Sequence, residues 1–453
     1  MFEEKPNDSD IIFKKIVETI PNSIFSDIWV YSQEFYNLPE YGYKIHISCD
    51  NNNYRMILDA CIPYLIKNKI SFKMVSNYFD FISLNKGDYG YTQIGKTVTI
   101  YPENVFEFKK IIFELYLMTK YIRSINIPSD FSFLNSEVIY YRFGELNTLD
   151  GDKSKKKIDR RTRYIDKSCK YFLPWHDIKK YSAIPNFLYP IQDIQSTSKS
   201  KIFKAYDSRY KKFCLLKVGI FLGNIENNKI DSFDRIAWES FIFKQLSFKK
   251  YVPNYVDAFI VGRDFFLLEE FIKGCNLEKA LVDNLLVGKE SDISLKIFNI
   301  VKDLHSLGYR IIDLSLNNFM FDLRYVYIID MEYMYKNSSN YYYIENYNQG
   351  TIGYFFPELK LSPILFDIYA LYKVLYFVNN RSEYIKFIST LKEQSFNEYK
   401  ESFVNKVEQG MLKKMSKYYN IDIYKCMIEF SYEQHLLFLS KFINKNKGKI
   451  KES

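Results

Sequence analysis

The stretch His305-Ser-Leu-Gly-Tyr-Arg-Ile-Ile-Asp-Leu-Ser-Leu-Asn-Asn318 carries more information about the fold than any other segment of the chain. It sets a carboxylate, Asp313, five residues before an amide, Asn318, in otherwise largely apolar sequence. A carboxylate can orient a hydroxyl group and take its proton, and an amide oxygen can hold a metal ion. By itself the pair decides little, and its meaning depends on the charged residues around it.

Charged residues also stand in apolar sequence on either side of this stretch. Upstream, Lys217 lies in the segment Cys214–Val218, and Glu239 follows in a segment of helical pattern. Downstream, Asp330 follows the apolar run that begins at Tyr327. Phosphoryl transfer needs a cation on the α- and β-phosphates, carboxylates on Mg²⁺ and a carboxylate beside the acceptor hydroxyl. The order of these residues therefore favours a phosphotransferase.

In this order the segments resemble the motifs of the eukaryotic-like protein kinases. Leu267–Gly274 resembles the hinge between the two lobes, Gly350–Glu358 the end of the activation segment, and Asp367 the helical Asp that braces the catalytic loop. The resemblance implies ATP or another NTP, and Mg²⁺, as cofactors. It also implies roles for six residues: catalytic Asp313, ATP-binding Lys217, Glu239 and Glu270, and metal-binding Asn318 and Asp330.

Three departures from the kinase pattern keep a pseudokinase open as an alternative. The segment Gln195–Lys204, where a phosphate-binding loop is expected, has no glycine, although glycine allows the closest backbone approach to phosphate. Ile312 replaces the usual Arg before the catalytic Asp, and Glu332 replaces the Gly of the metal-binding motif.

The N-terminal part contains a different group of polar residues. Tyr43–Ser48 alternates strictly, so a strand there places Lys44 and His46 on one face. Lysine and histidine side by side suit general acid and base catalysis, although a solvated strand face explains them as well. Lys73, Lys96 and Arg142 also lie in hydrophobic or β-rich segments, where a cation is costly to bury without an anion. If these cations converge with His46, they form a phosphate pocket.

The whole chain resembles the class III lanthipeptide synthetases, in which a lyase domain related to bacterial phosphothreonine lyase effectors precedes a Ser/Thr kinase domain. The N-terminal matches, in order, are Tyr43–Ser48, Phe72–Lys73, Leu84–Asn85, Gly95–Pro102, Tyr141–Gly144 and Asp159–Arg161. The resemblance implies that Lys44 removes the α-proton of a phospho-Ser or phospho-Thr residue and that His46 protonates the departing phosphate. It implies that Lys73, Lys96 and Arg142 hold that phosphate.

The predicted fold is α+β, with a phosphothreonine-lyase-like domain followed by a bilobal eukaryotic-like protein kinase fold. A length of 453 residues suits two domains. The basic run Lys153–Arg161 and a proline-punctuated stretch after it predict an extended connector. The expected boundaries are a lyase-like domain at 1–165, a linker at 166–194, a β-rich lobe at 195–271, an α-rich lobe at 272–445 and a disordered tail at 446–453.

The predicted function is a peptide dehydratase that phosphorylates Ser and Thr of a precursor peptide and eliminates the phosphate, leaving dehydroalanine or dehydrobutyrine. The alternatives are a Ser/Thr protein kinase with a regulatory N-terminal module and a pseudokinase scaffold for a separate synthetase. The family's cyclase domain is not found in this sequence, so ring closure would fall to a separate cyclase or not occur.

Composition limits the remaining classes of protein. A net charge of +9 over 453 residues is far from the dense basic stripe of a nucleic-acid-binding protein. The six cysteines are scattered and form no C-x-x-C pair, which suits a reducing cytoplasm. We find no signal peptide and no run of 18 apolar residues, so we expect a cytoplasmic protein without a membrane span.

Overall fold

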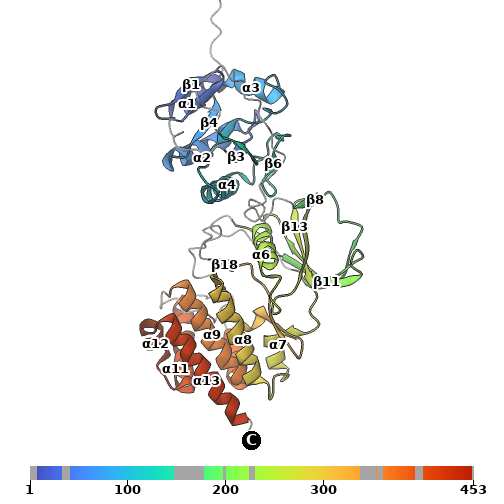
Figure 1. Cartoon of the computed structure of the whole chain (residues 1–453), viewed down its shortest axis with the longest axis vertical. Coiled ribbons are helices and arrows are strands. Elements are labelled where there is room, and N and C mark those ends of the chain that lie inside the picture. Colours follow the sequence, from blue (N-terminus) through green and yellow to red (C-terminus); the bar gives the residue numbers. More distant parts are fainter. Residues whose placement is uncertain are drawn as a thin grey trace, which may run out of the picture. The chain divides into compact units, whose positions relative to one another are not determined.

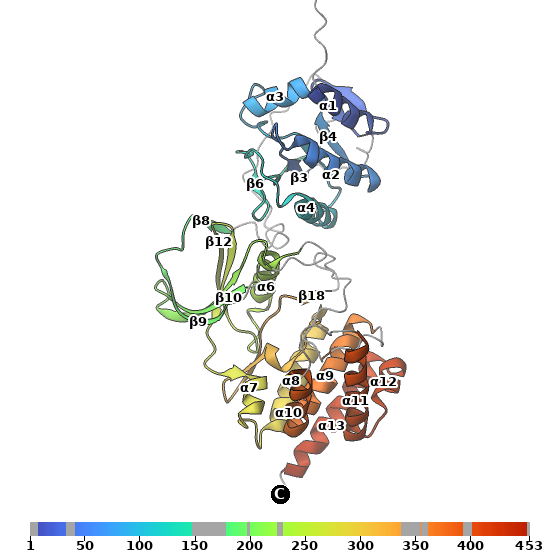
Figure 2. The ribbon, with the colours of Figure 1, turned by 180° about the vertical axis from the view of Figure 1, so that it is seen from behind.

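The computed structural model describes residues 8–32, 41–146, 178–196, 200–223, 230–336, 354, 361–392 and 401–450. The chain divides into two units, Met1–Ile178 and Lys179–Ser453 (Figures 1 and 2). Each unit has its own sheet and its own helices, so a mixed α+β architecture is confirmed.

In the first unit, the described residues form one antiparallel sheet of seven strands in the order β1-β2-β4-β5-β3-β7-β6. The strands are β1 (Ile24–Ser26), β2 (Trp29–Tyr31), β3 (Tyr41–Ile47), β4 (Phe72–Val75), β5 (Val98–Ile100), β6 (Phe131–Ser132) and β7 (Ile139–Glu145). The helices are α1 (Asp8–Glu18), α2 (Tyr54–Lys67), α3 (Tyr78–Lys86) and α4 (Val105–Thr119).

Helix α4 covers one face of this sheet and thereby fixes which face of β3 remains for chemistry. The helix begins where the Asn104 side chain accepts hydrogen bonds from two backbone N–H groups of the first turn, each 3.0 Å long. Its Phe108 ring stacks on Tyr43 of β3 at 4.2 Å between ring centroids. Tyr43 is in contact with α4, and residues alternate between the two faces of β3, so Lys44 and His46, which are also buried, lie on the opposite face.

In the second unit, the described residues form a sheet of six strands in the order β8-β12-β13-β11-β10-β9. The strands are β8 (Lys179–Tyr181), β9 (Leu188–Ser196), β10 (Ser200–Asp207), β11 (Lys212–Gly219), β12 (Tyr255–Val261) and β13 (Asp264–Glu270). Helix α6 (Ser232–Leu246) packs against β11 and β13. Buried side chains from these strands form a hydrophobic cluster that includes Leu188, Ala205, Leu216, Phe259 and Leu268.

Strands β8 and β9 correct the predicted connector at 166–194. Residues 179–181 pair with β12, and residues from Leu188 onward pair with β10. Pro190 falls in the proline-punctuated stretch predicted as an extended connector, but it stands on an edge strand opposite Ala205. A proline is tolerated there because its missing N–H group can lie on the open side of the strand.

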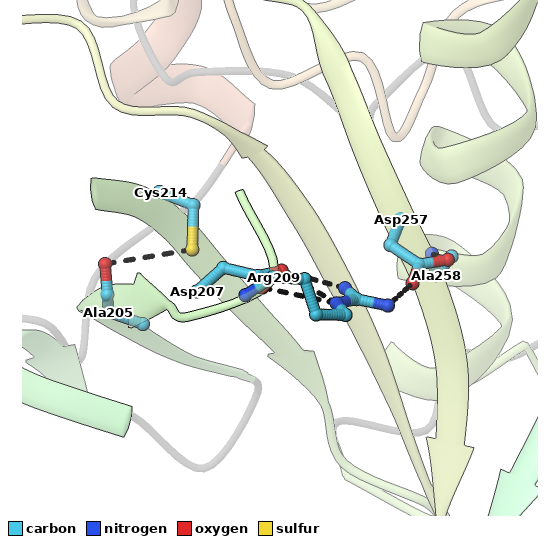
Figure 3. A network of polar contacts seen from close by, with 6 residues as sticks. All are labelled: Ala205, Asp207, Arg209, Cys214, Asp257 and Ala258. Carbon is cyan, nitrogen blue, oxygen red and sulfur yellow. Dashed lines mark hydrogen bonds and ion pairs between the residues drawn. The ribbon is translucent and has the colours of Figure 1, made fainter. Parts of the chain in front are cut away.

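Arg209, in the turn between β10 and β11, connects this turn to strand β12 (Figure 3). Its guanidinium donates to both carboxylate oxygens of Asp207 and, over 2.7 Å, to Oδ2 of Asp257 on β12. The same group lies 3.6 Å from the centroid of the Phe187 ring. A planar cation with several donors suits such a site, because it bonds two carboxylates and stacks on a ring at once.

The rest of the second unit is mainly helical, which confirms the predicted order of a β-rich part before an α-rich part. The helices are α7 (Leu277–Val282), α8 (Glu290–Ser306), α9 (Pro363–Asn379), α10 (Arg381–Lys392), α11 (Glu401–Tyr419), α12 (Ile423–Glu429) and α13 (Tyr432–Ile450), and a 3-10 turn spans Leu316–Asn318. The short strands are β14 (Cys275–Asn276), β15 (Tyr309–Arg310), β16 (Phe319–Phe321), β17 (Val326–Ile328) and β18 (Tyr335–Lys336).

The predicted disordered tail is wrong at its start, because helix α13 continues through Ile450. Its polar composition suggested fraying, but the backbone hydrogen bonds of a helix do not require apolar side chains. No helix in the described ranges has the length and apolar character that crossing a lipid bilayer requires.

Candidate active sites

The N-terminal cluster consists of Lys44, His46, Lys73, Lys96, Asp130 and Arg142. Antiparallel pairing sets Lys44 of β3 opposite Arg142 of β7. It also sets Thr99 of β5 opposite both His46 of β3 and Lys73 of β4. Residues directly opposite one another project from the same face of a sheet, so the cations come together on the face away from α4.

Lys96 and Asp130 complete this cluster from loops beside the sheet. The Lys96 ammonium lies 2.9 Å from Oδ1 of Asp130, and the other carboxylate oxygen contacts Nδ1 of His46. The three side chains are almost fully buried. The contact engages Nδ1 of the imidazole, and a carboxylate on that nitrogen fixes the orientation of the ring.

The electrostatics of the cluster favour a neutral lysine and a neutral imidazole. Burial, reinforced by the positive charges of Lys44, Arg142 and Lys96, lowers the pKa of Lys73 to about 7. Burial is also the largest cause that lowers the pKa of His46 to about 3; Asp130 opposes it, and nearby Lys96 adds to it. Burial would raise the pKa of Asp130, but His46 and Lys96 outweigh it and hold that pKa below its usual range.

Asp130 was not predicted from the sequence. It lies in the turn before β6, where an acidic residue after Pro128 and Ser129 suggests only a surface loop. A weak signal was available, because a buried histidine and a buried lysine need an anion nearby. The sequence alone does not say which of the chain's acids supplies it.

Aromatic rings line one side of the same cluster. The Lys73 ammonium lies 4.1 Å from the centroid of the Trp29 ring and 5.8 Å from that of Tyr31. The Lys44 ammonium lies 5.7 Å from the centroid of the Tyr101 ring. The site therefore combines cations with apolar walls.

The C-terminal cluster consists of Lys217, Glu239, Glu269, Asp313, Asn318 and Asp330. The Lys217 ammonium, on β11, lies 2.8 Å from Oε1 of Glu239 on α6 and 3.6 Å from Oε1 of Glu269 on β13. Burial alone would lower the pKa of Lys217, but Glu239, Glu269 and Asp330 outweigh it and hold that pKa above its usual range. Lys217 is therefore a fixed positive charge.

Hydrogen bonds from the backbone N–H groups on either side of Asp330 hold this segment to both halves of the cluster. The N–H of Ile329 donates to the carbonyl of Asn318, and the N–H of Met331 donates to Oε1 of Glu239, each over 2.9 Å. Asp330, between them, has a left-handed backbone with φ 58°. Non-glycine residues rarely adopt this conformation, and it is concentrated at functional sites.

The stretch around Asp313 is held by a buried carboxylate from helix α9. Asp367 accepts from the N–H groups of Ile311 and Ile312 and from Nε2 of His305, over 2.7 to 2.9 Å. Ile312 has φ 66°, which a β-branched residue adopts only under strong constraint. The Asn318 side chain donates to Oδ2 of Asp313 over 2.9 Å, so the predicted carboxylate and amide lie together.

Glu270, predicted to bind ATP, lies elsewhere. Its side chain is exposed and accepts a hydrogen bond of 2.6 Å from the Asn254 side chain. Because neighbours on a strand point to opposite faces, Glu269 reaches Lys217 instead. Glu269 was missed because two adjacent acids look alike in sequence.

Several predicted segments lie outside the described residues. They are the basic run 153–161, residues 197–199 of the expected phosphate-binding loop, and 350–358 apart from Tyr354. Glu332, the departure from the metal-binding motif, is buried. Within the described ranges, no three His, Cys, Asp or Glu side chains gather closely enough to hold a metal ion.

Comparisons with known proteins bear on the first unit most directly. Residues 22–166 match the family described as "RamC, N-terminal domain". The chain is also 22% identical over 258 residues to a protein of Streptomyces coelicolor described as "Probable SapB synthase". That match covers 52% of this chain and 28% of the relative, so the chain spans less than a third of the relative's length. Residues 22–166 are thus similar to the RamC N-terminal domain, and the chain is weakly similar to a protein described as a probable SapB synthase.

Proposed function

We propose that the chain dehydrates Ser and Thr residues of a lanthipeptide-type precursor peptide. The second unit phosphorylates the hydroxyl group, and the first unit eliminates the phosphate. The observation that carries this proposal is the convergence of Lys44, Lys73, Lys96 and Arg142 on His46 and Asp130. Such a group of cations beside an imidazole suits a phosphate dianion that must leave a carbon atom.

The elimination conserves atoms and charge in one step. A neutral lysine takes the α-proton of the phosphorylated residue, and the electron pair of that C–H bond forms the Cα=Cβ double bond. The Cβ–O bond breaks, and phosphate leaves with the electron pair of that Cβ–O bond. His46, oriented through Nδ1 by Asp130, donates a proton from Nε2 to the leaving oxygen. A bound dianion supplies the negative charge that raises the pKa of this imidazole toward the range of a proton donor.

The lowered pKa of Lys73 makes this residue a candidate for the base. A base must be neutral, and a pKa of about 7 leaves a large neutral fraction at neutral pH. Lys44, which the family resemblance suggested, lies opposite Arg142 and would then hold the phosphate. The two assignments separate experimentally, because loss of the base abolishes turnover whereas loss of a phosphate ligand mainly weakens binding.

The phosphorylation rests on the C-terminal cluster. Lys217, fixed by Glu239, would hold the α- and β-phosphates of ATP or another NTP. Asp313 would orient the peptide hydroxyl and accept its proton. Asn318 and Asp330 offer an amide and a carboxylate oxygen, the hard donors that Mg²⁺ takes together with water and nucleotide phosphates. Bound Mg²⁺ would neutralise the charge of the transferred phosphoryl group.

Mass spectrometry of a Ser/Thr peptide from a neighbouring gene tests both halves. With NTP and Mg²⁺, the wild type should give net loss of water at each modified residue. His46→Ala and Lys73→Ala should accumulate the phosphopeptide, whereas Lys67→Ala, which removes an exposed lysine of the same unit, should behave as wild type.

The two rival functions give other results. A wild type that stops at the phosphopeptide, and that leaves a synthetic phosphopeptide intact, would favour a kinase with a regulatory module. Absence of phosphorylation, with Mg²⁺-nucleotide binding that Asp330→Asn does not change, would favour a pseudokinase scaffold.

A further inference from the structure

Strand β2, which pairs with β4, carries two aromatic residues, Trp29 and Tyr31, that have no part in the reaction proposed above. On β2, Tyr31 lies opposite Lys73 and Trp29 opposite Val75 of β4, so both rings project from the face of Lys73. The Trp29 ring is the nearer, at 4.1 Å from the Lys73 ammonium to the ring centroid. Trp29 is half-buried.

This ring is a principal contact of the Lys73 ammonium. Among the described residues, no carboxylate lies within ion-pair distance of Lys73. Charged and titratable groups act on Lys73 from several neighbouring elements: Lys44 from β3, Arg142 from β7, Lys96 from the loop before β5, and Tyr31 from β2. His46 of β3 projects from the same face, because His46 and Lys73 both lie opposite Thr99, and Tyr101 contacts Lys44. The cations among them repel the charged form of Lys73, whereas the face of an indole attracts it.

We propose that Trp29 is a positioning residue for the elimination, which holds the Lys73 ammonium over its ring and stabilises the positive charge that develops as the lysine takes the α-proton. This inference rests on the proposed lyase function with Lys73 as the base. The ring attracts the ammonium but not the neutral amine. The amine is therefore free to approach the α-hydrogen, and the ring receives the ammonium after the transfer.

Two variants and a matched control separate this role from simple packing. Trp29→Leu removes the π face and keeps an apolar side chain, whereas Trp29→Phe keeps a smaller π face. Phe25→Leu removes an exposed aromatic side chain from the adjacent strand β1 and serves as the control. Thermal unfolding of each variant shows whether the first unit still folds.

The first measurement does not depend on activity. Competitive acetylation of the full chain across a pH series, read by mass spectrometry of the Lys73 peptide, gives the pH at which Lys73 becomes reactive. A cation–π contact of ordinary strength moves that midpoint by about half a pH unit. Trp29→Leu should therefore lower the midpoint by about half a unit or more, Trp29→Phe should lower it less, and Phe25→Leu should leave it unchanged.

The second measurement is the rate of phosphate elimination from a synthetic phosphopeptide. Trp29→Leu should lower kcat by about 3- to 10-fold with little change in KM, and Trp29→Phe should recover part of the loss. A midpoint that stays put or rises in a folded Trp29→Leu protein overturns the positioning role. If the wild type does not eliminate phosphate, the proposed function fails, while the labelling midpoint still reports on the contact itself.

Discussion

Replacement of Asp130 by asparagine tests the anion that holds the N-terminal cluster together. The carboxylate is buried and contacts Nδ1 of His46 and the Lys96 ammonium, the latter at 2.9 Å. Asparagine keeps the shape but loses the charge and one acceptor oxygen. Removing one partner of a buried ion pair costs about 3 to 5 kcal/mol, because the other charge stays buried.

This loss should appear in thermal unfolding of the first unit. For a domain of about 150 residues, each kcal/mol shifts the midpoint by roughly 2 to 4 °C, so Asp130→Asn should lower it by roughly 6 to 20 °C. The elimination rate of a synthetic phosphopeptide should fall by about 10²- to 10⁴-fold, which is the usual contribution of a positioned acid. Phosphorylation by the second unit should continue, because its residues come from another sheet.

Asp59→Asn is the matched control, since Asp59 is an exposed acid of the same unit, 3.6 Å from Arg55. It should change neither the unfolding midpoint nor the elimination rate. An Asp130→Asn protein that unfolds within about 1 °C of wild type and eliminates phosphate within about twofold would refute the electrostatic reasoning.

Three further predictions concern pH, the catalytic loop and the sheet of the second unit. In the free enzyme the pKa of Lys73 is lowered to about 7, and Lys73 acts only when neutral, so kcat/KM for elimination should rise as pH rises through about 7; a kcat/KM that declines steadily across this range would contradict its role. Asp367→Asn should reduce peptide phosphorylation by about tenfold or more, because an amide cannot accept hydrogen bonds from His305 and two backbone N–H groups. Elimination from a preformed phosphopeptide should stay unchanged and serves as the internal control. Arg209→Lys should lower the free energy of unfolding of the second unit by about 1 to 2 kcal/mol in urea titrations, because lysine cannot bond both carboxylates and stack on Phe187. Arg324→Lys, at an exposed position, is the control and should have no effect. Equal stability of the two variants would contradict the prediction.

Residues that act within one strand or one loop could be predicted from the sequence. The alternation in Tyr43–Ser48 correctly placed Lys44 and His46 on one face, because the period of a strand is a local property. The spacing of Asp313 and Asn318 likewise put the two side chains in contact, since a single short loop contains both.

Contacts between distant segments were not predictable in the same way. Asp130 reaches His46 only because the order of strands in the sheet brings its turn beside β3, and no local pattern encodes that order. Whether Glu269 or Glu270 reaches Lys217 depends on which face of β13 each side chain projects from, and the pairing of β13 with β11 sets this. The strand at Pro190 was missed for a related reason, since the position of β9 at the edge of the sheet follows from the order of all six strands.

The gathering of lysine and arginine side chains around His46 has a practical consequence for anyone handling this protein. If the proposed elimination takes place here, cations that bind the phosphate of a phosphopeptide will also bind inorganic phosphate after its release. Each turnover would then produce an inhibitor, and a phosphate buffer would occupy the site before any peptide binds. Work in sulfate- and phosphate-free solutions, with an enzyme that scavenges the product, should give the first unit its full rate.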